Sequence, residues 1–197
     1  MKVYIDGQEC HELSAIADAA SILSIAGEAA SKEGKVVSEI RVDDVLMDEE
    51  AFLSVQGGLT AHLRTQPVRE LVRESVDEAI NYIPRLTKGL EEISLHFEGG
   101  ELVAAQSKLA DAADGLDWLL RVFQSCCALM AMNEETSESG MKNLRNSLSE
   151  SINLLGGLYE EKKYFQMALC IRQKLLPDIE KFSVYIQRLR DIVTSTQ

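Results

Sequence analysis

The chain has 197 residues, of which 46% are hydrophobic and 26% are charged, and its formal net charge at pH 7 is -12. This composition is ordinary for a globular protein with a sizeable core, and it excludes the fibrous and intrinsically disordered classes. Because a strongly acidic surface repels phosphate backbones, we expect no nucleic-acid partner.

The negative charge is concentrated near the N-terminus. Residues 1–66 hold 5 lysines and arginines against 12 aspartates and glutamates, a net charge of -7. The chain has no run of about 18 apolar residues and does not open with a secretory signal pattern, so we expect a cytoplasmic protein with no membrane partner. The four cysteines have neither C-x-x-C spacing nor the density of a disulfide scaffold, and we expect them to be reduced.

The first 66 residues alternate between strand and helix patterns. Residues 3–13 alternate around the turn residues Asp6 and Gly7, which predicts a β-hairpin. Residues 14–33 form an amphipathic pattern with Ser14 as the N-cap, which predicts a helix ending near Gly34. Two further strands are predicted in the segments "KVVSEIRVDD" and "GLTAHLRT". The first should place Val36, Ser38, Ile40 and Val42 on one face and Val37, Glu39 and Arg41 on the other.

An acidic segment between these two strands is expected to contain a turn and one turn of helix. The resulting order of strand, strand, helix, strand, strand resembles the β-grasp, or ubiquitin-like, fold, which implies a helix packed across one face of a mixed sheet. Gly57-Gly58 matches the diglycine of ubiquitin-type tails, but 139 residues follow it here, so that activation chemistry is not implied.

The remaining residues carry apolar stripes at alternating spacings of three and four, which is the pattern of long helices that pack along a seam. Breaks at Gly99-Gly100 and in "NEETSESG", residues 133–140, predict helices that fold back on each other. Pro84 and Pro177 lie inside stripes, where a missing N–H kinks or divides a helix. Six stripe residues are expected to be buried: Leu109, Leu116, Phe123, Leu148, Leu155 and Phe182.

We therefore predict an α+β protein in which a small β-grasp-like N-terminal domain, residues 1–66, precedes a long antiparallel four-helix bundle, residues 67–197. Within residues 152–176, five residues have the spacing of a tetratricopeptide repeat: Leu155, Gly156, Tyr159, Phe165 and Ala168. The segment therefore resembles a single repeat of that family, although Lys163 stands where the family usually has glycine. Two interpretations remain open: a bundle hairpin with similar packing, which we favour, or a true repeat.

The sequence contains no recognisable catalytic set, which favours a non-catalytic protein but leaves catalytic activity open, and we expect no cofactor and no metal. His11, His62 and His96 have no Glu-x-x-His partner, and the acidic cluster of residues 43–50 lacks the ligand order of a calcium loop. Cys126 falls on a core stripe as a small apolar residue. Phosphate-binding loops, nucleophile elbows and zinc-protease helices are absent.

Trp118 is the one residue that we single out as a candidate binding residue. It follows the stripe residue Leu116 by two positions, which places it beside the seam. Two roles are open: packing beneath the N-terminal domain, or anchoring a protein partner.

The leading hypothesis is a non-catalytic protein-interaction or scaffold protein, because two modules that bind other proteins are joined without a catalytic set. One alternative is a small acidic export chaperone, similar to bacterial flagellar and secretion chaperones. The other is an enzyme or ligand-binding protein with a pocket between the two domains. The sequence specifies neither the partner nor the oligomeric state.

Overall fold

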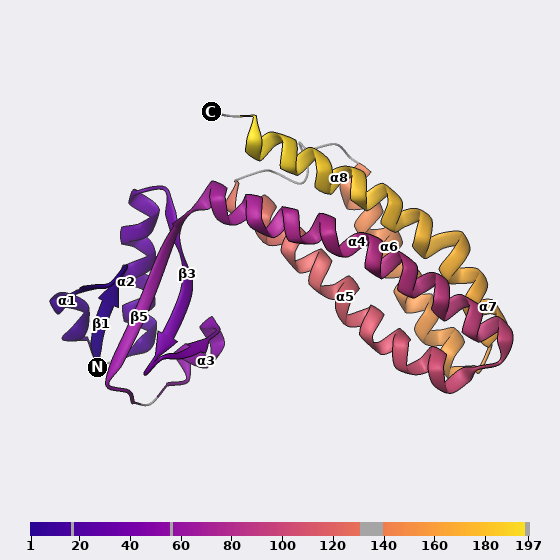
Figure 1. Cartoon of the computed structure of the whole chain (residues 1–197), viewed down its shortest axis with the longest axis horizontal. Coiled ribbons are helices and arrows are strands. Elements are labelled where there is room, and N and C mark those ends of the chain that lie inside the picture. The colour runs from indigo at the N-terminus through magenta and orange to yellow at the C-terminus, as the bar shows by residue number, and fades with distance from the viewer. Residues whose placement is uncertain (17, 56, 131–139, 196–197) are drawn as a thin grey trace. The chain divides into compact units, whose positions relative to one another are not determined.

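The computed structural model describes residues 1–16, 18–55, 57–130 and 140–195 and divides into two compact units, Met1–Leu71 and Val72–Gln197. A small mixed sheet precedes long antiparallel helices, which confirms the predicted α+β class (Figure 1). The domain boundary between Gln66 and Pro67 stays a prediction. In the structure the last strand ends at Pro67 and the next helix begins at Val68.

The N-terminal unit is a five-stranded sheet with the order β2-β1-β5-β3-β4. β1 and β5 pair in parallel and the other neighbours pair antiparallel, and α2 lies across one face of the sheet. The elements are β1 (Lys2–Ile5), β2 (Gln8–Glu9), α1 (His11–Ser14), α2 (Ala19–Lys32), β3 (Lys35–Val42), β4 (Val45–Met47), α3 (Glu49–Leu53) and β5 (Thr60–Pro67).

The prediction that the first helix begins at Ser14 is wrong. Ser14 ends the short helix α1, where its hydroxyl accepts a hydrogen bond from the backbone N–H of Val3 and donates one to the carbonyl of Cys10. α2 begins only at Ala19, because the carboxylate of Asp18 accepts from the N–H of Ser21 and caps the helix. Sequence analysis also missed β4, which pairs with β3 over three residues.

Strict alternation along β3 is wrong as well. The register with β5 shifts between Val37 and Glu39, which leaves Ser38 as an extra residue in a β-bulge. The bulge changes the side-chain phase, so Val37 packs against the same apolar cluster that contains Ile40 and Val42.

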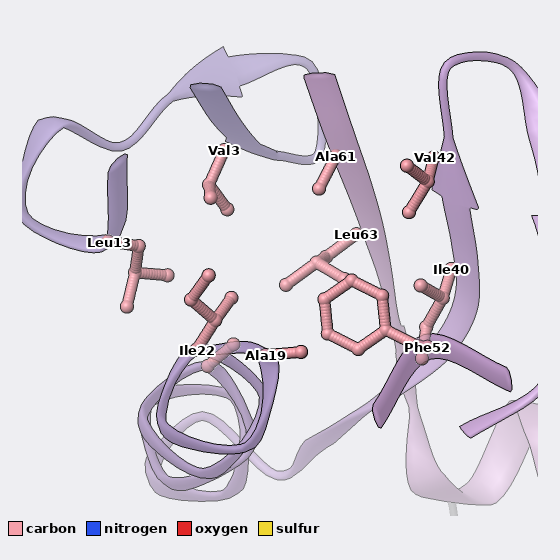
Figure 2. Close-up of a cluster of buried hydrophobic side chains, with 10 residues drawn as sticks. Val3, Leu13, Ala19, Ile22, Ile40, Val42, Phe52, Ala61 and Leu63 are labelled. Atoms are coloured by element: carbon pink, nitrogen blue, oxygen red, sulfur yellow. The ribbon is translucent and has the colours of Figure 1, made fainter. Parts of the chain in front are cut away.

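That cluster is the core of the N-terminal unit. Figure 2 shows Val3, Ala61 and Leu63 directed from the sheet toward Ala19 and Ile22 of α2. Leu13, Ile40, Val42 and Phe52 close the cluster from the surrounding elements. Phe52 is fully buried, which explains why α3 stays against the sheet although it is only five residues long.

Two turn carboxylates hold the ends of the central strand β5. Asp43 accepts hydrogen bonds from the N–H groups of Leu59 and Thr60, and Asp6 accepts from the N–H and hydroxyl of Thr65. Both aspartates have positive φ, at 47° and 49°, a conformation that aspartate tolerates better than most residues. The hydrogen bonds from Thr60 lower the pKa of Asp43, and those from Thr65 lower the pKa of Asp6.

The second unit is a bundle of long helices. It contains α4 (Val68–Gly99), α5 (Leu102–Leu129), α6 (Gly140–Glu160) and a last helix made of α7 (Tyr164–Cys170), a π-helical turn (Ile171–Leu175) and α8 (Leu176–Thr194). Gly100, with a φ of 76°, makes the turn after α4, as the sequence predicted. The other predicted break, residues 133–140, lies outside the described residues except for Gly140.

The two prolines behave differently. The sequence predicted a kink or a division at each proline; α4 continues through Pro84, so the helix is not divided there. Pro177 follows the π-helical turn at the start of α8. Proline has no N–H, so it cannot donate a hydrogen bond to the carbonyl of the preceding turn. The π-helical turn before Pro177 is wider than an α-helical turn, and it accommodates this missing hydrogen bond without ending the helix.

Aromatic and ionic contacts join the helices of the bundle. Phe123 of α5 and Phe182 of α8 meet edge to face at 5.4 Å, and Asp77 of α4 binds Arg190 of α8 at 2.7 Å. The buried carboxylate of Asp178 accepts a hydrogen bond from Ser147 of α6 and binds Lys181 at 2.9 Å. In the part of the chain that the structure describes, no helix combines the length and apolar character needed to cross a membrane.

Five of the six predicted core residues of the bundle are buried: Leu116, Phe123, Leu148, Leu155 and Phe182. Leu109 is only half-buried, which contradicts the prediction. It lines a surface crevice that is open on one side and is also bordered by Ile152 and Tyr159 of α6.

Replacing Leu116 by Ala should lower the free energy of unfolding by about 2 to 5 kcal/mol, because the side chain is 5% exposed and its removal leaves a cavity. Val103 lies on the same helix but is 83% exposed, so Val103→Ala should change stability by less than about 0.5 kcal/mol. Urea denaturation followed by circular dichroism compares the two variants, and equal losses would contradict the packing described here.

Acid should weaken the N-terminal unit through Asp6 and Asp43. Their pKa values are lowered in the folded state, so their stabilisation is present above about pH 4 and is lost as pH falls through the lowered values. Between about pH 5 and pH 2.5, Asp6→Asn/Asp43→Asn should therefore lose less stability than the unchanged protein. Asp44→Asn, in the same turn as Asp43 but without these hydrogen bonds, should keep the full pH dependence in denaturation titrations.

Candidate peptide-binding groove

Half of β3 has a free edge. β5 pairs with β3 from Lys35 to Val42, whereas β4 pairs with β3 only from Ile40 to Val42. Within the described residues, Lys35–Glu39 therefore has a strand partner on one side only. An unpaired strand edge presents backbone N–H and C=O groups that another extended chain can bind.

The free edge exists because the chain leaves the sheet immediately after β4. Asp48 follows Met47, and its carboxylate accepts a hydrogen bond of 2.7 Å from the N–H of Ala51. Asp48 thereby caps α3, and the backbone turns away from β3 at the position where a longer β4 would face Glu39.

A groove of about 660 Å³ lies along this edge, between α2 on one side and β3 and β4 on the other. Leu23 of α2, Val37 of β3 and Met47 of β4 line it, and all three are half-buried and pack against the core. On the α2 side the groove is bordered by Gly27, which has no side chain. A Cβ added there would meet no atom within 4 Å. The size and the apolar lining suit several side chains of an extended peptide.

The charged residues that line the groove are Lys35, Glu39, Asp48 and Glu49, one basic residue against three acidic ones. Lys35 binds Glu33 at 2.7 Å, and this hydrogen bond raises the pKa of the lysine. Glu39 binds Arg41 at 2.5 Å, which lowers the pKa of the glutamate. Both side chains are therefore charged at neutral pH, and the groove as a whole is negative.

The polar residues that line the groove come from α2, β3 and the start of α3. None of the described residues that line it is a cysteine or histidine, and the lining serines, Ser31 and Ser38, come from different elements. The hydroxyl of Ser38 donates to the carbonyl of Arg64 across the bulge, which is a structural role. The described residues also include no group of three or more histidine, cysteine, aspartate or glutamate side chains placed to hold a metal ion.

Sequence analysis did not find this groove. It joins residues of four elements, α2, β3, β4 and α3, and its open edge depends on the length of β4. One signal was present: an eight-residue strand, "KVVSEIRV", is followed by a two-residue turn and only "VLM" before the helix cap Asp48. A hairpin of eight residues against three must leave one strand partly unpaired.

The sequence-predicted residue Trp118 lies in the other unit, on α5. It is half-buried and meets Tyr82 of α4 edge to face at 5.3 Å, and the guanidinium of Arg85 lies 5.3 Å from the centre of the Tyr82 ring. The ring of Tyr82 is close to Gly115 of α5. One role of Trp118 is thus a contact inside the bundle, and its role as a partner anchor stays a prediction.

The cysteines are placed as packing residues. Cys126, Cys127 and Cys170 are buried and form no disulfide with the described residues, and Cys10 is half-buried. Burial raises the pKa of Cys126 to about 11 and also raises the pKa of Cys170. A thiol with a raised pKa is a poor nucleophile at neutral pH, as the core-packing interpretation of Cys126 requires.

The fold thus defines an α+β protein whose small sheet carries a peptide-sized groove and whose larger part is a helical bundle. Residues 74–184, more than half of the chain, match a protein family described as "Domain of unknown function (DUF8042)", and the chain belongs to this family. Comparisons with curated proteins and with solved structures gave no match. The family match falls on the bundle, and the groove, at residues 23–49, lies outside it.

Gly115→Ala should change the fluorescence of Trp118, the only tryptophan of the chain. A Cβ at this position would lie 1.8 Å from the Tyr82 hydroxyl oxygen, so the tyrosine ring must move and expose more of the indole. The emission maximum should shift to longer wavelength. At Gly89 an added Cβ meets no atom within 4 Å, so Gly89→Ala should leave the emission unchanged, and identical spectra for the two variants would contradict the contact.

Proposed function

We propose that this protein is a non-catalytic protein-interaction protein that binds an extended segment of another protein as an added strand beside Lys35–Glu39. The single observation that carries the proposal is the free edge of β3 next to a groove with an apolar floor. In this mode of recognition, backbone hydrogen bonds supply affinity and pockets for alternate side chains supply specificity.

The dimensions of the groove fit this mode. Five strand residues span about 16 Å at roughly 3.3 Å per residue, which is enough for a short ladder. A bound strand would direct every second side chain toward Leu23, Val37 and Met47. The ubiquitin-like likeness of the unit supports the proposal only as an analogy, because fold alone does not define function.

The edge also carries features that prevent non-specific pairing. The bulge at Ser38 interrupts the regular ladder, and Lys35 and Glu39 place charges along the strand. Natural proteins use bulges and charges to protect exposed edges from aggregation. These features favour a ligand of defined sequence over indiscriminate strand pairing.

The bundle is proposed as a second contact surface, with Trp118 as one of its anchors. Its crevice of about 360 Å³ is lined by apolar residues of α5 and α6, among them Leu109 and Ile152. We also propose that the protein works in the cytoplasm, where the free thiols of its buried cysteines would persist.

The groove can be filled without unfolding the protein. Gly27→Leu should place a side chain in the open space above the groove floor, whereas Gly27→Ala leaves most of this space free. Both changes replace a glycine inside a helix, so both should raise helix stability by up to about 1 kcal/mol. The pair therefore separates occupancy of the groove from stability of the fold.

A displayed library of random seven-residue peptides should select ligands of the full chain, and Gly27→Leu should weaken the selected peptides at least about tenfold in fluorescence anisotropy. Gly27→Ala should bind them within about twofold of the unchanged protein. Ligands should also lose binding when proline replaces residues that donate N–H groups to β3. Selected peptides that bind Gly27→Leu normally would show that the groove is not the binding site.

A further inference from the structure

We propose that the groove takes a partner segment that runs antiparallel to β3, with apolar residues at alternate positions and basic residues at its N-terminal end, beside Glu49. This inference rests on the proposed function and specifies the partner of the same site. It is carried by the direction of β4, by the charges at the two ends of the groove and by the lining of its floor.

The direction follows from the existing ladder. β4 runs antiparallel to β3, and Met47, its last residue, pairs with Ile40. The line that β4 would follow beyond Met47 is the free edge from Glu39 to Lys35. A segment that continues this line extends the antiparallel ladder, so its first residue lies beside Asp48 and Glu49 and its last residue lies beside Lys35.

The two ends of the groove differ in charge. At one end, Lys35 is bound to Glu33, so its charge is compensated. At the other end, Glu49 is exposed, and its side chain has no ion pair or hydrogen bond with the residues that the structure describes. Asp48, which also lines the groove, adds negative charge at the same end. The uncompensated charge thus lies where the N-terminus of an antiparallel segment would be placed.

A basic segment is also favoured by the field of the whole unit. Residues 1–66 carry a net charge of -7, so a positively charged segment is attracted before contact and a negatively charged one is repelled. The same charge disfavours a second copy of this chain as the occupant, because two acidic units would have to approach each other. Exposed charge pairs are weak and screened by salt, so the preference must be strongest at low ionic strength.

Alternating apolar residues follow from the floor. Leu23, Val37 and Met47 lie on the core side of the groove. Successive side chains of a strand point to opposite faces, so every second residue of the bound segment meets this apolar floor. The residues between them face away from it and are free to be polar.

The test uses the full chain and three synthetic peptides in which valine and threonine alternate over five residues. One carries two lysines before this core, one carries two lysines after it, and one carries two glutamates before it, all with blocked termini. The lysine-first peptide should bind at least about fivefold more tightly than the other two in anisotropy at low salt. High salt should reduce this difference.

Two charge-reversal variants locate the effect. Glu49→Lys should weaken the lysine-first peptide at least about fivefold, whereas Glu50→Lys, which changes the net charge equally but does not line the groove, should change it less than about twofold. Thermal unfolding by circular dichroism verifies that both variants are folded. Equal effects of the two variants would overturn the assignment of Glu49 and leave only a general charge effect.

The outcomes separate the two proposals. If all three peptides bind equally and Gly27→Leu abolishes their binding, the charge and direction inferred here are wrong while strand binding in the groove stands. If Gly27→Leu leaves binding of every peptide unchanged, or if no peptide binds, the groove does not act as inferred. Tighter binding of the lysine-last peptide would overturn the antiparallel direction.

Discussion

The pairing of the central strand β5 is the constraint on which the N-terminal unit depends. β5 lies between β1 and β3, contributes Ala61 and Leu63 to the core, and is held at its two ends by the carboxylates of Asp43 and Asp6. Because β5 pairs with the whole of β3, the far half of β3 stays extended without help from β4. The free edge is therefore already extended in the sheet, and a partner would not have to order it first.

Most of the fold could be predicted because it depends on local periodicity. The apolar stripes predicted the helices of the bundle. The alternation of apolar and polar residues around the turn Asp6-Gly7 predicted the first hairpin. The errors have physical causes that lie outside local pattern. A bulge at Ser38 changes side-chain phase through the register with a distant strand, and Leu109 is half-buried because the facing helix does not cover it. Asp18 and Ser14 are both acceptable caps. The hydroxyl of Ser14 is engaged by the N–H of Val3 and the carbonyl of Cys10, and Asp18 caps α2 instead.

The candidate site was less predictable than the fold, because it is defined by the lack of a second partner strand beside Lys35–Glu39 of β3. The groove is lined by residue types that are common throughout proteins. From the sequence, Gly27 only lowers the predicted stability of its helix, and the structure is needed to show the open space next to it. Trp118 attracted notice because it is large and lies off the stripe, and the structure gives it a neighbour in Tyr82. The family match adds no residue of the groove, because it covers only the helical unit.

The direct passage from β5 into α4 has a mechanical consequence. Pro67 ends the strand and Val68 begins the helix, so no loop residue separates β5 from α4. Tension applied between the N-terminus and the bundle would pull β1 and β5 past each other along their length, because the two strands are parallel. The four residue pairs of this ladder would then bear the force at the same time and would separate together, instead of one after another. The sheet that carries the groove would therefore resist a force in this direction more than a force that separates the two strands from one end.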